Sequence, residues 1–279
     1  MKKKLDQLSE KDFLFFRIPH ESGRQSPKNM KHILITSSII TILLLGLLNV
    51  FVFIDRFDPP HQVIVIISLI YNVVGVSLIG LAIVFSFKKI YQKRQKFQYL
   101  LVALFINLVY GPFFYIIGLY ILTDPTQFHH RMGISASNLI LLITVTLLIG
   151  LGIFVYSYVH TMKLLQQGKF RKGTERYKKQ QTNERNEPNT YIGSVAALLS
   201  GTLGNGIYLT RRYGENMPDD IVIFIMFGAA AIYVLMLLLP RQLVILYCKG
   251  RFKSFQFNDE NELNPVGSSS RRYYENKTT

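Results

Sequence analysis

The sequence has little cysteine and little charge for its length. Its 279 residues include one cysteine, Cys248, and no tryptophan. A single cysteine excludes an internal disulfide and any zinc site built from several cysteines. Charged residues make up 18% of the chain and hydrophobic residues 49%, whereas soluble domains carry about 25% charge. This composition indicates an integral membrane protein and excludes disorder for most of the chain.

The patterns that mark common catalytic sites are also missing from the sequence. No HExxH, GxSxG or P-loop motif occurs, and no Asp, Glu, Lys, Arg or His lies deep within the apolar windows given below. The second absence argues against a proton-coupled pump, a voltage sensor or a carboxylate-based sodium site. His61, His129 and His130 are weak metal-ligand candidates because they lack HxxxH spacing. We therefore expect no catalytic residue, no cofactor and no metal ion.

The sequence does contain six long apolar windows. A bilayer core about 30 Å thick needs roughly 20 apolar residues per helix, so each window predicts one span. The fold expected is an all-α polytopic bundle of six transmembrane helices. The fifth window is the weakest, and the sixth is expected to end at Pro240. The windows cover residues 33–54, 63–87, 97–122, 134–158, 191–209 and 221–239.

Basic residues alternate between the connecting segments and predict the orientation. The N-terminal arm, the second and fourth loops and the C-terminal segment hold 28 of the 32 Lys and Arg residues. Cytoplasmic loops carry such an excess, so both termini are predicted to be cytoplasmic. The external loops are too short to fold as domains.

The chain therefore divides into three expected parts. These are a basic arm at 1–32, the transmembrane domain at 33–247, and a basic tail at 248–279 that is disordered from Asn258 onward. The cytoplasmic segments are polar, and we expect them to lack a core of their own.

Three cytoplasmic segments carry more specific expectations. Ser9–Ile18 predicts a short interfacial helix capped by Ser9, with a partner docking site as the alternative. Lys169–Arg185 resembles a flexible linker with helical character. Leu243–Phe257 predicts an amphipathic extension on the inner leaflet.

The polar residues of the windows are mainly Asn, Ser and Thr, and one asparagine falls in each of the first five windows. Buried amides are expensive in hydrocarbon unless they are paired, and amides bonded across helices contribute about 0.6 to 2 kcal/mol each. Interhelical contacts are the favoured interpretation, and a polar cavity open to the outside is the alternative. The five asparagines are Asn49, Asn72, Asn107, Asn138 and Asn205.

Small residues repeat every four positions along the fifth window and form two adjoining stripes. Such stripes let neighbouring backbones approach closely, so we expect a central, closely packed helix. A broken helix lining a substrate site is the alternative. Gly228–Ala231 offers a matching small surface, and Gly111-Pro112 predicts a kink in the third span. The stripes consist of Gly193, Ala197 and Gly201 on one side and Ala196, Ser200 and Gly204 on the other.

These features favour a non-enzymatic plasma-membrane protein that acts through protein contacts, as an accessory, assembly or immunity protein. The abundance of Lys, Ile, Phe and Tyr indicates an AT-rich, bacterial genome. In general build the chain is similar to small multi-pass accessory or immunity proteins of bacterial secretion and toxin systems, although no motif carries the likeness. A permease-like subunit or channel for a neutral or lipophilic solute is the first alternative, and a membrane enzyme without a recognisable motif is the second.

The expected partners follow from the same features. The basic inner face attracts anionic lipid, and the spans lie in the lipid bilayer. A membrane-protein partner or a second copy of the chain is the other expected partner. Nucleic acid is not expected, because membrane orientation already accounts for the basic charge.

Overall fold

A computed structural model describes residues 5, 7–23, 25–54, 62–123, 136–186 and 219–267. This part of the chain is helical, and its one β-bridge joins Phe257 to Leu263. Five of its helices are long and apolar enough to cross a membrane: Pro27–Phe53, Gln62–Phe85, Gln95–Tyr120, Ala136–Gln166 and Ile225–Arg251. The fifth predicted span, 191–209, lies outside the described residues.

The first spanning helix, α3 (Pro27–Asn49), begins earlier than the apolar window. Ser26 has an extended backbone, and its side chain accepts a hydrogen bond from the Asn29 N–H at 3.3 Å. Pro27 takes the first helical position, where a missing N–H costs nothing. The polar turn from Pro27 is therefore part of the helix, which continues into the π-helical turn η2 (Val50–Ile54).

The next two spans are joined by a short basic turn. Helix α4 (Gln62–Phe85) is followed by α5 (Lys88–Lys93), and the third span comprises α6 (Gln95–Leu104), the π-helix η3 (Phe105–Tyr110) and α7 (Gly111–Thr123).

The predicted irregularity at Gly111-Pro112 takes the form of the π-helix η3. The Gly111 N–H donates to the Ile106 carbonyl, five residues back. The ring of Pro112 pushes the preceding turn away and leaves its carbonyls in need of donors. The hydroxyl of Tyr71 on α4 donates to one of them, the Val109 carbonyl, at 2.9 Å.

The last two long helices exceed their predicted lengths. Helix α8 (Ala136–Gln166) is followed by α9 (Glu175–Asn186), and α11 (Asp219–Arg251) continues through Pro240. The prediction that the sixth span ends at Pro240 is therefore wrong. Side-chain hydroxyls can replace the helix bonds lost at a membrane proline, and Ser157 of α8 donates to the Leu237 carbonyl at 2.7 Å.

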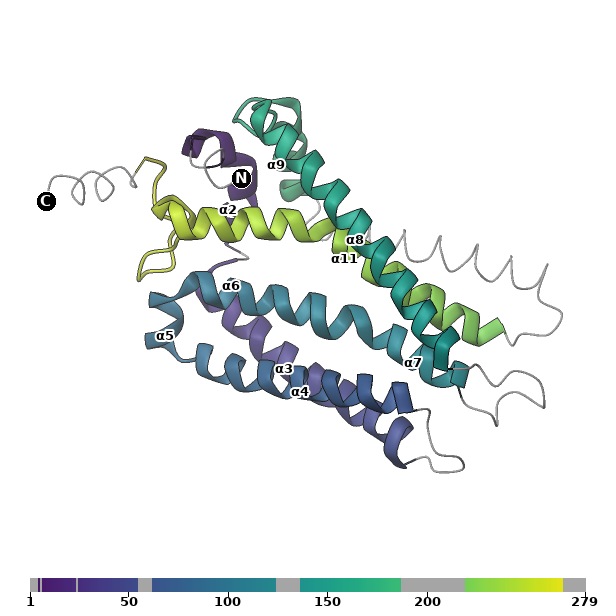
Figure 1. Ribbon diagram of the computed structural model, residues 1–279. Coiled ribbons are helices and arrows are strands. Elements are labelled where there is room, and N and C mark those ends of the chain that lie inside the picture. Colours follow the sequence, from purple (N-terminus) through teal and green to yellow (C-terminus); the bar gives the residue numbers. More distant parts are fainter. Residues whose placement is uncertain are drawn as a thin grey trace, which may run out of the picture.

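Helix α11 organises the described bundle. It packs most extensively on α7 and α8, while α3 packs on α4. Helix α7 comes closest to α11 at Gly228, where an added Cβ would overlap with the backbone of Tyr115. The small surface predicted at Gly228–Ala231 thus receives α7. In Figure 1, α8 crosses α11 at an angle, and both helices run toward the side of the bundle that holds α2 and α9.

A folded layer covers that side of the bundle, and we call it the terminal layer. It comprises the 3₁₀ helix η1 (Glu10–Arg17), α2 (Ile18–Glu21), the segment 162–186 with α9, and the segment 248–267 with η4 (Lys253–Phe255). Its core side chains are almost fully buried: Phe13, Phe16, Phe170, Phe252 and Phe255.

The terminal layer corrects several sequence predictions. The segments outside the spans are not simply polar, because five of their phenylalanines are buried. These rings belong to the same hydrophobic cluster as the long helices and therefore extend the core of the bundle. The short helix predicted at Ser9–Ile18 is present with Ser9 as its N-cap, but it is a 3₁₀ helix, and its side chains Phe13 and Phe16 are buried within the protein. Leu243–Arg251 continues helix α11 rather than forming a separate extension, and 258–267 contains turns and a β-bridge partner after it.

Candidate functional site

Asn49 and Asn72 form a reciprocal amide pair between α3 and α4. Asn49 Nδ2 donates to Asn72 Oδ1 at 3.0 Å, and Asn72 Nδ2 donates to Asn49 Oδ1 at 2.9 Å. Asn72 Nδ2 also reaches the Ser68 carbonyl at 2.9 Å. Both amides are half-buried. This geometry satisfies the polar groups locally and ties the two helices together.

Asn107 forms a second interhelical contact, from the π-helix η3 to α11. Its Nδ2 donates to Gln242 Oε1 at 2.9 Å and to the Ala103 carbonyl at 2.7 Å. The sequence analysis did not single out Gln242, because it follows Pro240 and lay beyond the expected end of the span. Asn107 Oδ1 and Ser68 Oγ are buried without a hydrogen bond in the described part of the chain.

The other candidate residues from the sequence are either exposed or outside the described part of the chain. Asn138 lies at the exposed start of α8. Asn205 and both small-residue stripes lie outside the described residues, as do His61, His129 and His130. The stripes comprise Gly193, Ala196, Ala197, Ser200, Gly201 and Gly204. Within the described residues no group of three or more His, Cys, Asp or Glu side chains is placed to hold a metal ion.

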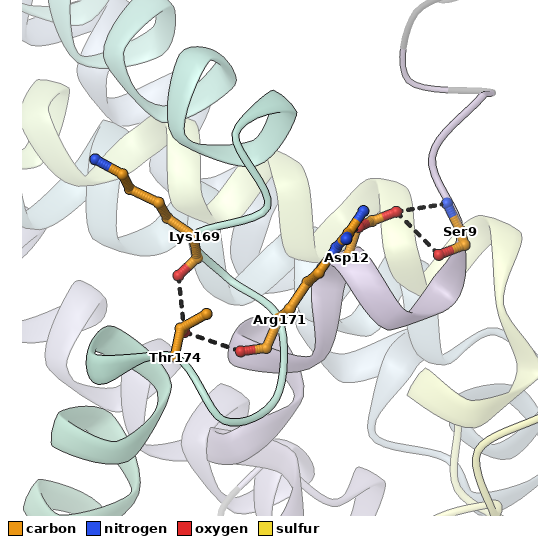
Figure 2. A network of polar contacts seen from close by, with 5 residues as sticks. All are labelled: Ser9, Asp12, Lys169, Arg171 and Thr174. Atoms are coloured by element: carbon orange, nitrogen blue, oxygen red, sulfur yellow. Dashed lines mark hydrogen bonds and ion pairs between the residues drawn. The ribbon is translucent and has the colours of Figure 1, made fainter.

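One edge of the terminal layer is fastened by Asp12 and Arg171. Arg171 Nε donates to Asp12 Oδ1, while the Ser9 N–H and hydroxyl both donate to Asp12 Oδ2 at 2.9 Å (Figure 2). Burial raises the pKa of the Asp12 carboxyl, but these hydrogen bonds outweigh burial and hold the pKa below its ordinary value. The ionised carboxylate therefore joins η1 to the turn after α8.

The turn that presents Arg171 is itself held by a threonine. The Thr174 hydroxyl is bonded to the Lys169 and Arg171 carbonyls at 3.0 and 2.9 Å (Figure 2). Gly168 and Gly173 have φ of 67° and 91°, a left-handed conformation that glycine adopts without strain. These local features set the direction from which Arg171 reaches Asp12.

The opposite edge of the layer is clamped by Gln95 at the start of α6. Its Nε2 donates to the Phe257 carbonyl at 2.8 Å, and its Oε1 accepts from the Phe257 N–H at 2.9 Å. The side-chain amide thus pairs with the backbone of Phe257 as a neighbouring strand would. This contact fixes the segment after α11 against the bundle.

His20 lies at the centre of the terminal layer, with no exposed surface. Neither ring nitrogen makes a hydrogen bond in the described part of the chain. The ring packs against Phe255 and Phe257, with centroids 5.9 and 6.2 Å away. Burial, and then the charges of Lys249 and Arg17, hold the pKa of His20 well below its usual range, while the Phe16 carbonyl opposes the shift. His20 is therefore a neutral imidazole at pH 7.

Lys249 enters the same region from the end of α11, with only 2% of its surface exposed. Its Nζ donates to the Phe255 carbonyl at 3.3 Å. It also lies over the rings of Tyr99 and Phe257, 5.7 and 5.5 Å from their centroids. Aromatic faces stabilise a cation that has lost its water. Lys249 is thus held by one carbonyl and two rings.

Arg17 completes the buried cationic group. Its Nη2 donates to the Asn264 carbonyl at 3.0 Å, and its Nε faces Glu21 at 3.3 Å. Its Nη1 has no hydrogen-bond partner in the described part of the chain. From the sequence, Arg17 and Lys249 were counted only among the basic residues of the predicted cytoplasmic segments. The one sequence signal that their side chains are buried is the aromatic content of the neighbouring segments.

Comparisons with protein-family models, with curated proteins and with solved structures found no match.

Proposed function

We propose that this chain is a six-span, non-enzymatic plasma-membrane protein that acts through contacts with another membrane protein. Its proposed orientation places both termini and the terminal layer in the cytoplasm. The observation that carries the proposal is the pairing of intramembrane amides across helix interfaces. Asn49 is bonded to Asn72, and Asn107 is bonded to Gln242. Amides used in this way hold helices together and leave fewer groups to line a solute path.

The helix directions support the six-span topology. Both α8 and α11 run toward the terminal layer (Figure 1). Two spans that run the same way require another crossing between them, which the predicted span at 191–209 would supply. The short helix α5, with Lys88, Lys89 and Lys93, lies at the same end as the terminal layer. An accumulation of basic residues at one end supports the cytoplasmic assignment of that end and contact with anionic lipid.

The terminal layer supports action through protein contacts. Three segments distant in the sequence fold there around a shared aromatic core, which gives a defined surface outside the spans. The exposed face of α9 includes Arg176, Lys179 and Thr182. A rigid, charged surface suits recognition of an acidic cytoplasmic region of a partner, because complementary charge steers encounter and fixes orientation.

A permease-like subunit or channel for a neutral solute is the second candidate. Asn107 Oδ1 and Ser68 Oγ are buried without hydrogen bonds in the described part of the chain, and a solute donor would satisfy either atom. The π-helix η3 beside Asn107 adds weight, since π-helical turns are frequent at functional sites. These two atoms are the specific observation in favour of transport.

The proposal is tested by separating stability from activity. Asn72→Leu and Asn107→Leu are compared with the parent for thermal stability in detergent and for cellular activity per folded molecule. Under the proposal, activity follows the amount of folded protein. Activity that falls per folded molecule while stability holds would instead support transport.

Photocrosslinking addresses the partner directly. A photoreactive residue at Thr182 in the terminal layer should give one discrete adduct in cells, whereas the same residue at Leu147, on the exposed face of α8, serves as the matched position within the spans. If neither position crosslinks to protein, and the purified chain moves a neutral solute across vesicles, the proposal is wrong.

A further inference from the structure

The N-terminal arm, residues 7–23, is tied to the end of α11 around one buried histidine. His20 belongs to α2, while its neighbours Phe255 and Phe257 follow α11 and Lys249 belongs to α11. Phe13 of the same arm packs on Phe252, with ring centroids 5.6 Å apart. The arm thus closes over the C-terminal segment through aromatic packing with an imidazole in the middle.

The surroundings of His20 favour the neutral imidazole over the protonated one. Neither ring nitrogen makes a hydrogen bond in the described part of the chain. The Phe16 carbonyl is a nearby acceptor that favours a ring proton, but it can serve only one of the two N–H groups of a charged ring, so the other would have no acceptor there. A buried charge without a partner is strongly unfavourable. Packing of the arm against the end of α11 is therefore favoured while the His20 ring is neutral and is weakened when the ring gains a proton.

The charged groups around His20 increase this preference. Lys249 from α11 and Arg17 from η1 both act on it as positive charges. Helix α9, which packs against α2 and η1, contributes Tyr177, whose phenol lies near Glu21 and Arg17. Glu21 is paired with Arg17, and the segment after α11 presents the apolar rings of Phe255 and Phe257. A protonated His20 would add a positive charge beside two others.

We propose that the terminal layer is an acid-sensitive clasp, in which protonation of His20 releases the N-terminal arm from the end of α11. Release would uncover the aromatic surface formed by Phe252 and Phe255. The terminal layer would then present a different surface in acid than at neutral pH. This inference goes beyond the proposed function and does not depend on it.

The pH window follows from the direction of the linkage. The closed state holds His20 neutral, whereas in the released arm its pKa returns to about 6.5. The clasp therefore has its full stability above about pH 6.5 and weakens as the pH falls below it, by up to about tenfold in the closing equilibrium per pH unit. The Asp12 contact responds only below about pH 4, near the ordinary pKa of a carboxyl, so a range of pH 7.5 to 4.5 avoids it. Comparison with a variant that lacks the imidazole separates His20 from the other groups that titrate in this range.

The experiment measures amide hydrogen exchange of residues 8–20 in the full-length protein in lipid nanodiscs, between pH 7.5 and 4.5. The parent is compared with His20→Phe at each pH, so that the intrinsic pH dependence of exchange cancels. His32→Phe is the matched control, because His32 lies on α3 with an exposed side chain. We expect the parent, but not His20→Phe, to lose protection of the arm by at least tenfold across this range, and His32→Phe to behave as the parent.

Cys248 provides a second readout of the same opening. It is the one cysteine in the chain, is fully buried, and shares a core cluster with Phe13 and Phe252. Its labelling by a thiol reagent should rise in the parent relative to His20→Phe as the pH falls. The ratio between the two proteins at each pH removes the thiol's own pH dependence.

A fixed charge at position 20 tests the proposal without any titration. His20→Lys should release the arm already at pH 7.5, seen as lost protection at residues 8–20 with unchanged protection in α7. An arm that stays protected in His20→Lys would overturn the proposal. So would parent and His20→Phe proteins whose exchange follows the same pH profile.

Discussion

The hydroxyl of Ser157 on α8 donates a hydrogen bond to the Leu237 carbonyl on α11, three residues before Pro240. Tyr71 on α4 makes the same kind of bond to the Val109 carbonyl, three residues before Pro112. In both helices a proline weakens the preceding turn, and a neighbouring helix supplies the missing donor. The interfaces α8–α11 and α4–η3 are therefore specified by hydroxyl groups as well as by apolar packing.

Replacing Ser157 with Ala should lower the free energy of unfolding by about 1 to 2 kcal/mol, because the hydrogen bond from this hydroxyl to the Leu237 carbonyl is lost. The loss should shrink in a Pro240→Ala background, where residue 240 regains its N–H and the preceding turn no longer clashes with the proline ring. Thermal unfolding of the four proteins of this double-mutant cycle measures the coupling. Ser77→Ala, on the exposed face of α4, is the control. Equal losses in both backgrounds would contradict the explanation.

The Asn49–Asn72 pair should show energetic coupling. Either Asn49→Leu or Asn72→Leu leaves one amide unpaired, and each should destabilise the bundle by about 0.6 to 2 kcal/mol. The double variant leaves neither amide unpaired, so it should be more stable than the sum of the single losses implies. Thermal stability of the four proteins in detergent checks this, and additive losses would show that the pair contributes no joint stability.

Gly228 should tolerate no larger residue. A Cβ at this position would overlap with the backbone of Tyr115 on α7, whereas nothing lies within 4 Å of a Cβ at Gly80. Gly228→Ala should therefore push α7 from α11 and destabilise by about 1 to 3 kcal/mol. Gly80→Ala should change stability little. Folded yield and melting temperature of the two variants measure the difference, and a Gly228→Ala protein as stable as Gly80→Ala would refute the close approach.

The Asp12–Arg171 contact should stabilise the arm at neutral pH and not in strong acid. The lowered pKa of Asp12 means that its contribution is complete above about pH 4 and is lost as the pH falls below that value. Asp12→Asn should therefore increase hydrogen exchange at residues 8–20 at pH 7. The increase relative to the parent should become smaller as the pH falls below about 4. Arg171 is well exposed, so solvent limits the effect to a few-fold.

Cysteine accessibility should establish the topology. In a Cys248→Ala background, cysteines placed at Asp58 and Thr126 should react with an impermeant thiol reagent added to intact cells. A cysteine at Thr182 on α9 should react only after the cells are permeabilised. The reverse pattern would place the terminal layer outside the cell and overturn the orientation argued from the basic residues.

The sequence by itself determined that the chain is helical and apolar enough to enter a membrane, because hydropathy over about 20 residues depends only on local composition. It located the five spans that the structure describes to within a few residues at most ends. The early start of α3 at Ser26-Pro27 was readable from capping chemistry, although the apolar windows alone did not include it.

The tertiary structure alone decided where polar and aromatic groups from distant segments meet. Pro240 resembled a helix end, whereas α11 continues past it and, at the Leu237 carbonyl three residues earlier, receives a hydrogen bond from the hydroxyl of Ser157 on another helix. His20 and Lys249 are more than 200 residues apart in the sequence, and their shared burial follows from the packing of Phe13, Phe252 and Phe255. Hydropathy is a local property, whereas burial of a charge and satisfaction of a carbonyl depend on contacts between segments, which folding alone creates.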